Sequence, residues 1–350
     1  MRSFQISVLA AGLLLAAFAP QAQIPVNPQA GSQGGENRLT GAGSSFVYPL
    51  MSKWSSVYNQ ATKVQVNYQS IGSGGGIKQF TAGTVDFGAT DAPMTDDEMK
   101  AAKGAVLHIP VTMGAVAITY NVPGTSGTLN MSGPTIAKLF MGDIKMWNDP
   151  ELAKDNPNVK LPDTAVVVVH RSDGSGTTFI LADYLSKVSP EWKQRLGTGK
   201  SLTWPVGIGG KGNEGVSAAV TRTPGAIGYV ELLYAEQAKM ARAAVLNKAG
   251  KFVAPSAEAV TAAAAELKEI PEDLRASITD APGETAFPIS GIVWVLARPQ
   301  GQDKTNAAAV RTFVEWVLGD EGQALASPMN YSKLPPALLE KARAKAAQIK

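Results

Sequence analysis

The feature that most constrains the fold is the stretch from Val166 to Leu185. It opens with four consecutive valines, Val166–Val169, which predict a buried strand. A Gly/Ser turn follows at residues 172–176, and the apolar spacing of residues 179–185 predicts a helix. Backbone N–H groups at a helix N-terminus have no intrahelical partner, and the helix dipole adds partial positive charge there. The unit therefore favours anion binding, although an ordinary capped strand–helix turn explains the same pattern.

The side chains around this turn strengthen the anion hypothesis. Glycines let the backbone approach a ligand closely, hydroxyl groups can donate hydrogen bonds, and a guanidinium fork suits an oxyanion. The residues concerned are Arg171, Gly174, Ser175, Gly176, Thr177 and Thr178.

Two similar turns occur earlier in the chain. Gly43-Ser44-Ser45 follows a short strand that starts at Leu39, and Ser73-Gly74-Gly75 follows the alternating strand Val64–Tyr68. Neither turn, nor the one at Ser175, has the Gly-Lys-Ser/Thr ending of a Walker A loop. Because ligands in open α/β sheets bind outside the carboxyl ends of strands, we expect the three turns to converge on one anion.

Composition limits the possible functions. The 350 residues suggest two domains, and a net charge of +3 gives no indication of nucleic-acid binding. Cysteine is absent, and the only histidines are His108 and His170. A histidine-rich metal centre or a Ser-His-Asp triad is therefore not expected, and we predict no catalytic residue, no metal and no cofactor.

The N-terminus has the pattern of an export signal. Arg2 is followed by the uncharged apolar run Val8–Ala19, which is short for a membrane span. We expect residues 1–22 to be a cleaved signal peptide and residues 23–37, rich in Gln, Pro, Gly and Asn, to be a disordered lead-in.

Strands alternate with helices along the rest of the chain, which predicts an α/β fold with mostly parallel sheets. We expect two lobes, one from residues 38–112 with 256–350 and the other from 113–255. Residues 106–120 read as two strands, broken at Pro110 and Gly114, that cross between the lobes. A short helix is expected at 216–221 and a single long helix at 307–325.

Several motifs, in their order along the chain, resemble those of the periplasmic phosphate-binding proteins of bacterial ABC-type phosphate importers. These motifs are Thr40–Phe46, Tyr68–Gly76, Val85–Pro93, Arg171–Thr177, Gly207–Asn213 and Pro224–Val230. The resemblance covers nearly the whole mature chain. It implies a two-lobed, hinged periplasmic binding protein of type II.

The resemblance also implies a function and a set of ligand contacts. The expected function is high-affinity phosphate binding between the lobes and delivery to the membrane permease of the ABC importer, by a periplasmic monomer that is not an enzyme and binds no nucleic acid. The implied phosphate contacts are Ser45, Phe46, Ser73, Asp91, Arg171, Ser175, Gly176 and Thr177. The alternatives are a secreted phosphatase or serine hydrolase using Ser73 or Ser175, a surface adhesion protein on the same fold, and a binding protein for another oxyanion such as sulfate.

A carboxylate in an anion site has a specific use. Phosphate near neutral pH keeps a proton that Asp91 can accept, whereas sulfate has none and meets only like charge. The alternative is that Asp91 caps the helix predicted near Thr95, where Thr95 and Glu98 form a capping-box pattern. We expect Asp173 to orient Arg171 rather than to contact the ligand. Lys211 either adds positive potential or is a solvated loop residue.

Overall fold

The computed structural model describes residues 38–102, 104–125, 127–299 and 307–350. The predicted signal peptide and lead-in lie outside these residues. The strands are β1 (Arg38–Gly43), β2 (Gln65–Ser70), β3 (Phe87–Thr90), β4 (Leu107–Asn121), β5 (Asn130–Met131), β6 (Val167–Arg171), β7 (Ile208–Gly210), β8 (Ala226–Glu231), β9 (Ala241–Arg242), β10 (Ala244–Leu246), β11 (Phe252–Val253) and β12 (Ser290–Ala297). The helices are α1 (Tyr48–Thr62), α2 (Ser73–Ala82), α3 (Asp96–Ala101), α4 (Gly133–Met141), α5 (Pro150–Asp155), α6 (Gly176–Val188), α7 (Pro190–Arg195), α8 (Gly212–Arg222), α9 (Leu232–Gln237), α10 (Ala257–Ala265), α11 (Ala307–Val317), α12 (Asp320–Ala324), α13 (Pro336–Ala346) and the 3₁₀ helix η1 (Ser327–Met329).

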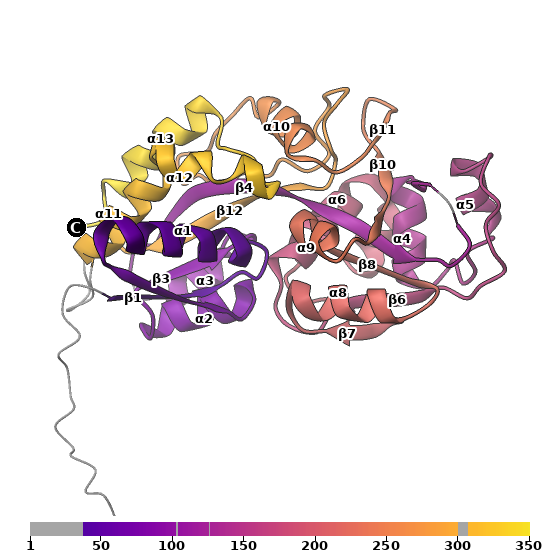
Figure 1. Ribbon diagram of the computed structural model, residues 1–350, viewed down its shortest axis with the longest axis horizontal. Helices are drawn as coiled ribbons and strands as arrows, with labels where there is room; N and C mark the ends of the chain where they lie inside the picture. The colour runs from indigo at the N-terminus through magenta and orange to yellow at the C-terminus, as the bar shows by residue number, and fades with distance from the viewer. Residues whose placement is uncertain (1–37, 103, 126, 300–306) are drawn as a thin grey trace, which may run out of the picture. The chain divides into compact units, whose positions relative to one another are not determined.

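One continuous sheet links two parallel groups of strands. Within the described residues its order is β2-β1-β3-β12-β4-β8-β6-β7, with β9 also paired to β4. Strands β2, β1 and β3 are parallel to one another, and so are β8, β6 and β7. Antiparallel β12 and β4 lie between the two groups, and Figure 1 shows β4 running from one group to the other. The α/β class is as expected, with antiparallel strands added at the junction.

The predicted break in residues 106–120 is wrong, because β4 is a single strand. Its first part, up to Ala115, pairs with β12, and its second part, from Val116, pairs with β8. The ladder accommodates Pro110, which has no N–H, by a register shift opposite Val293 and Trp294. The strand is buried along nearly its whole length, as its apolar sequence requires.

Helices cover both faces of the β1–β3 group, and in the view of Figure 1 α1 lies above these strands and α2 below them. Strand alternation explains the two separate apolar clusters on these faces. Leu39 of β1 packs with Trp54 and Phe87, whereas Ala42 packs with Ile77 and Phe80 of α2. The apolar contacts of one face therefore hold α1 against the sheet, and those of the opposite face hold α2.

Two helix predictions need correction. The expected helix at 307–325 is divided into α11, which ends at Val317, and α12, whose N-cap is Gly319. The helix expected at 216–221 begins earlier, at Gly212, and is preceded by β7, which the sequence did not indicate. By contrast, α3 has the predicted capping box between Thr95 and Glu98.

Candidate functional site

The three predicted turns meet at one place. Ser45 follows β1, Ser73 is the first residue of α2, and Ser175 is the N-cap of α6. Gly74 N–H donates to the carbonyl of Gly174 at 2.9 Å, which joins two of the turns directly. All eight predicted ligand residues are buried, and the structure brings them into one polar cluster.

Gly176, the first residue of α6, lies against Asp91, which follows β3, and against Ser73, the first residue of α2. A Cβ at this position would come within 2.2 Å of Asp91 Oδ2 and 2.6 Å of Ser73 Oγ. No side chain larger than hydrogen fits there without displacing the carboxylate. The glycine therefore brings the backbone N–H at the start of α6 close to Asp91.

Several buried backbone donors in the cluster are free to bind a ligand. In the described part of the chain, the N–H groups of Phe46, Ser73, Gly176 and Thr177 have no hydrogen-bond partner. Three of these N–H groups belong to the first turns of α2 and α6, where intrahelical partners do not exist. Because unpaired buried donors are costly, their gathering in one place indicates an acceptor-rich ligand.

Tyrosine hydroxyls fix the turn after β1. The carbonyl oxygens of Ser44, Ser45 and Phe46 accept hydrogen bonds from Tyr68 (2.9 Å), Tyr234 (2.7 Å) and Tyr331 (2.7 Å), respectively. With its carbonyl held by Tyr234, the Ser45–Phe46 peptide has its N–H directed the opposite way, since the two groups of a trans peptide point apart. Tyr234 and Tyr331 lie far from the turn along the chain, so no local pattern indicated them, and Tyr68 was included only as the first residue of the motif Tyr68–Gly76.

Asp91 is part of the cluster and is not a helix cap. It follows β3, is 2% exposed, and its Oδ1 accepts a hydrogen bond from Ser73 Oγ at 3.0 Å. Thr95 caps α3 instead, so the capping interpretation of Asp91 is wrong. Burial raises the pKa of Asp91 to about 6, against the opposing effects of Ser44, the Arg171 charge and Ser73. The carboxylate is therefore placed to take up a proton near neutral pH.

Arg171 ends β6 and is held by its neighbours. Its Nε and Nη2 donate to Asp173 at 2.8 and 2.5 Å, and its Nη1 donates to Thr177 Oγ1 at 3.3 Å. Asp173 also accepts the Gly212 N–H at 3.0 Å. Burial alone would favour the neutral acid, but Arg171 and this N–H hold the pKa of Asp173 below its usual range. The expected pairing of Asp173 with Arg171 is thus present.

Asn213 belongs to the cluster, although the sequence did not single it out. It is fully buried at the start of α8 and contacts Ser45 and Thr177. The only available signal was its place at the end of the motif Gly207–Asn213. Lys211 in the same turn is exposed, as expected for a solvated loop residue.

Neither histidine is paired with a serine of the cluster. His108 is buried on β4, and its Nε2 accepts the Met94 N–H at 3.0 Å. Burial lowers the pKa of His108 to about 4, so it is a neutral core residue. His170 stacks on Trp204 with ring centroids 4.9 Å apart.

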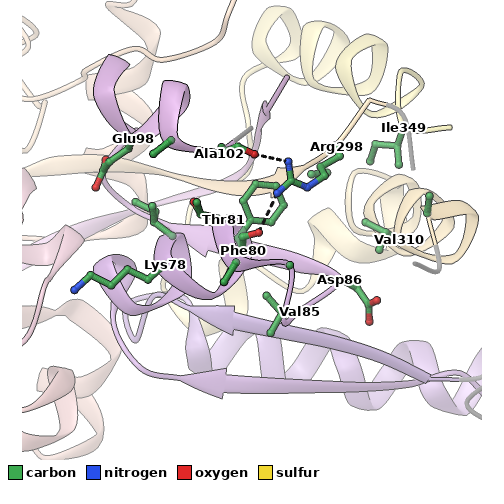
Figure 2. Close-up of a pocket in the computed structure, with 16 residues that line it drawn as sticks. Lys78, Phe80, Thr81, Val85, Asp86, Glu98, Ala102, Arg298, Val310 and Ile349 are labelled. Carbon is green, nitrogen blue, oxygen red and sulfur yellow. Dashed lines mark hydrogen bonds between the residues drawn. The ribbon is translucent and has the colours of Figure 1, made fainter. Parts of the chain in front are cut away.

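A cavity of about 800 Å³ lies apart from this cluster and is shown in Figure 2. It is lined mainly by apolar groups such as Phe80, Val310 and Ile349, and none of the eight predicted ligand residues lines it. Its arginine, Arg298, already donates to the carbonyls of Ala102 (3.0 Å) and Phe80 (3.2 Å). None of the four unpartnered N–H groups of the polar cluster belongs to a residue that lines this cavity.

Among the described residues, no group of three or more His, Asp or Glu side chains is placed to hold a metal ion. In the same residues, no helix has both the length and the apolar character needed to cross a membrane.

Comparisons with known proteins agree with this arrangement. Residues 28–321 match the family model described as PBP superfamily domain. The chain is 45% identical over 319 residues to the phosphate-binding protein PstS of Xylella fastidiosa (strain 9a5c), covering 91% of this chain and 87% of that protein. It is 46% identical over 308 residues to PstS of Pasteurella multocida (strain Pm70), covering 87% and 89%.

Solved structures show the same fold. A high affinity periplasmic phosphate-binding protein bound with phosphate aligns with a TM-score of 0.72 at 20% identity, covering 88% of this chain and 93% of the other. The phosphate-binding protein from Stenotrophomonas maltophilia aligns with a TM-score of 0.70 at 20% identity, covering 88% and 94%. The fold is the two-lobed type II fold of periplasmic binding proteins. The chain belongs to the PstS family of phosphate-binding proteins, within the PBP superfamily.

Proposed function

We propose that this protein binds inorganic phosphate in the periplasm and delivers it to the membrane permease of an ABC-type importer. The observation that carries the proposal is the set of four buried, unpartnered N–H groups beside the Arg171 guanidinium and the Asp91 carboxylate. Donors and a cation suit the ligand oxygens, and the carboxylate suits a ligand that still has a proton. Membership of the PstS family supports the same ligand.

The proposed contacts divide by chemistry. Phe46, Ser73, Gly176 and Thr177 donate through backbone N–H groups, and Ser45, Ser175 and Thr177 through hydroxyls. The Ser73 hydroxyl donates to Asp91 Oδ1. Arg171 donates with its charge, and Asp91 accepts the proton of the ligand. Ser175 Oγ accepts the Thr178 N–H at 3.0 Å, which leaves its hydroxyl hydrogen available.

The direct test is calorimetry of phosphate-stripped protein. Titration with phosphate is expected to give one site per chain, and sulfate at the same concentration is expected to bind far more weakly. Folded, ligand-free protein that gives no heat with millimolar phosphate would refute the proposal, and stronger binding of sulfate would favour the sulfate alternative.

We also propose that the lobes are residues 38–112 with 256–350, and residues 113–255, and that they close over the ligand. Segments of the two proposed lobes touch each other: Lys200 Nζ lies 2.7 Å from Glu98 Oε2, and Gly74 bonds to Gly174. Closure should make the molecule more compact, so small-angle scattering is expected to give a smaller radius of gyration with phosphate. Identical profiles with and without ligand would contradict closure.

The enzyme alternative makes a different prediction. Neither His108 nor His170 contacts Ser73 or Ser175, and the base that is bonded to Ser73 is the Asp91 carboxylate rather than an imidazole. We therefore propose a binding role without catalysis. Release of phosphate from a phosphate ester by metal-supplied protein, above the level of an Arg171→Ala preparation, would contradict this.

Export is proposed through residues 1–22, with 23–37 as the lead-in and a monomer as the mature form. N-terminal sequencing of protein recovered from the periplasm tests the cleavage. An intact Met1, or recovery only from the cytoplasm, would contradict it.

A further inference from the structure

Asn213 touches a hydroxyl group from each side of the site. Its Nδ2 donates to Ser45 Oγ at 2.9 Å and to Thr177 Oγ1 at 3.2 Å. Its backbone N–H donates to Ser45 Oγ as well, at 3.1 Å. Its Oδ1 accepts the Glu231 N–H at 2.9 Å. Every polar atom of this fully buried side chain is thus occupied.

The orientation of the Asn213 amide follows from these contacts. The backbone N–H of Glu231 can only donate, so the group that faces it must be Oδ1. If the amide were flipped, the Nδ2 donor would face the Glu231 N–H donor, and two buried donors without an acceptor are energetically costly. The two N–H bonds of Nδ2 therefore face Ser45 and Thr177.

The contacts with Asn213 decide what the two hydroxyls can do. A hydroxyl oxygen has two acceptor positions and one hydrogen to donate. Ser45 Oγ accepts twice from Asn213, and Thr177 Oγ1 accepts from Asn213 and from Arg171 Nη1 at 3.3 Å. Since both acceptor positions are filled in each case, the hydroxyl hydrogen is all that remains for a ligand.

We propose that Asn213 is a positioning residue that makes the Ser45 and Thr177 hydroxyls obligate donors to the bound oxyanion. It does so without touching the ligand. The inference rests on the proposed function, because only a ligand rich in acceptors gains from such hydroxyls. It extends the site beyond the eight predicted residues, to α8.

Replacing the amide by a carboxylate reverses this arrangement. In Asn213→Asp the two hydroxyls turn to donate to the new carboxylate, and their oxygens then face the ligand. At about pH 8.5 phosphate is a dianion with one proton, and we expect it to bind at least about 100-fold more weakly than to the wild type. At about pH 5.5 phosphate has a second proton that can bond to a hydroxyl oxygen, and the loss is expected to shrink to about tenfold.

The comparison uses calorimetry of stripped protein at both pH values, always as a ratio to the wild type. Apart from the carboxylate that Asn213→Asp introduces, the charged and titratable groups around position 213 are the same in both proteins. These groups are Asp91, Arg171, Asp173, Glu214, Glu231 and Tyr234. Thermal unfolding without phosphate shows that each variant is folded.

Two further variants separate positioning from a structural role. Asn213→Ala removes the side-chain donors without reversing them, so its loss of about tenfold should be similar at both pH values. Asn156→Asp places a carboxylate at another buried asparagine, which bonds to Asn130 and Leu152 away from the site. It should alter thermal stability and leave phosphate affinity unchanged. If Asn213→Asp does not fold, Asn213→Ala decides: wild-type affinity in that variant would overturn the inference.

The outcomes distinguish this inference from the proposed function. Wild-type protein that binds no phosphate overturns both. Wild-type protein that binds phosphate, with an Asn213→Asp loss that is equal at the two pH values, overturns the inference alone. A loss that is larger at the higher pH supports it when Asn213→Ala, which adds no charge that could repel the dianion, also binds phosphate more weakly than the wild type.

Discussion

The two sides of the site are built in different ways. On the Arg171 side, the supporting residues are close in sequence, since Asp173 and Thr177 both contact the guanidinium. On the Ser45 side, the supports come from distant segments, namely Asn213, Tyr234 and Tyr331. The charged side is therefore assembled locally from one strand–turn–helix unit, whereas the other side is complete only after the whole chain has packed.

The largest expected effect concerns the locally built side. Arg171→Ala removes the only cation among the proposed contacts and leaves Asp173 without its buried partner. Phosphate binding is expected to weaken by about 2–5 kcal/mol, measured by calorimetry. Arg195→Ala, at a half-exposed arginine paired with Asp143 and Glu191, is the control and should bind normally. Equal affinities for wild type and Arg171→Ala would show that the guanidinium does not hold the ligand.

A second effect concerns stability in the absence of ligand. Because burial raises the pKa of Asp91 from 3.8 to about 6, the folded protein keeps a proton that the unfolded chain has already released between these pH values. The stability contributed by Asp91 is therefore lost as pH rises from about 4 to about 6, and the charged form costs about 3 kcal/mol above that range. Asp91→Asn should raise the free energy of unfolding by up to this amount at about pH 7.5.

Chemical unfolding of stripped protein across this pH range measures the effect. The difference between Asp91→Asn and wild type should disappear below about pH 3, where Asp91 is protonated in both states. Asp97→Asn, at an exposed carboxylate, is the control. A difference that is constant with pH would mean that the Asp91 charge is not the cause.

The same substitution tests selectivity on the side that is assembled from distant segments. Asn keeps the shape of Asp91, removes its charge and can donate to a fully ionised oxyanion. Sulfate affinity is expected to improve by about 1–3 kcal/mol, with a modest change for phosphate. Competition of sulfate against labelled phosphate at fixed pH and ionic strength measures this. A variant that excludes sulfate as strongly as wild type would leave Asp91 with no role in selectivity.

The smallest effect concerns the distant supports themselves. Tyr234→Phe removes the hydrogen bond to the Ser45 carbonyl and frees the peptide that presents the Phe46 N–H. Phosphate affinity should fall by about 1 kcal/mol, measured by calorimetry. Tyr120→Phe removes a buried hydroxyl that bonds to Leu129, outside the site, and should affect stability alone. If both variants bind phosphate equally well, distant support of this turn is unimportant.

The sequence by itself determined the local units and their chemistry. Residues 166–185 form a strand, a turn and a helix. A run of valines has no polar face for solvent and therefore forms a buried strand, and Ser175 of the Gly/Ser turn caps the helix that follows. The capping box at Thr95 and the Arg171–Asp173 pair were predictable for the same reason: their partners lie within three residues. The type of ligand also followed locally, since helix N-termini, hydroxyls and a guanidinium all suit an oxyanion.

Only the tertiary structure decided the features that depend on distant packing. Asn213 contacts Ser45 across 168 positions, and Tyr331 contacts Phe46 across 285, so no local pattern could indicate either. The same holds for β4, whose continuity past Pro110 depends on its pairing with β12 and β8. The pKa of Asp91 is likewise a tertiary property, because it depends on how completely the surrounding segments exclude water from the carboxylate.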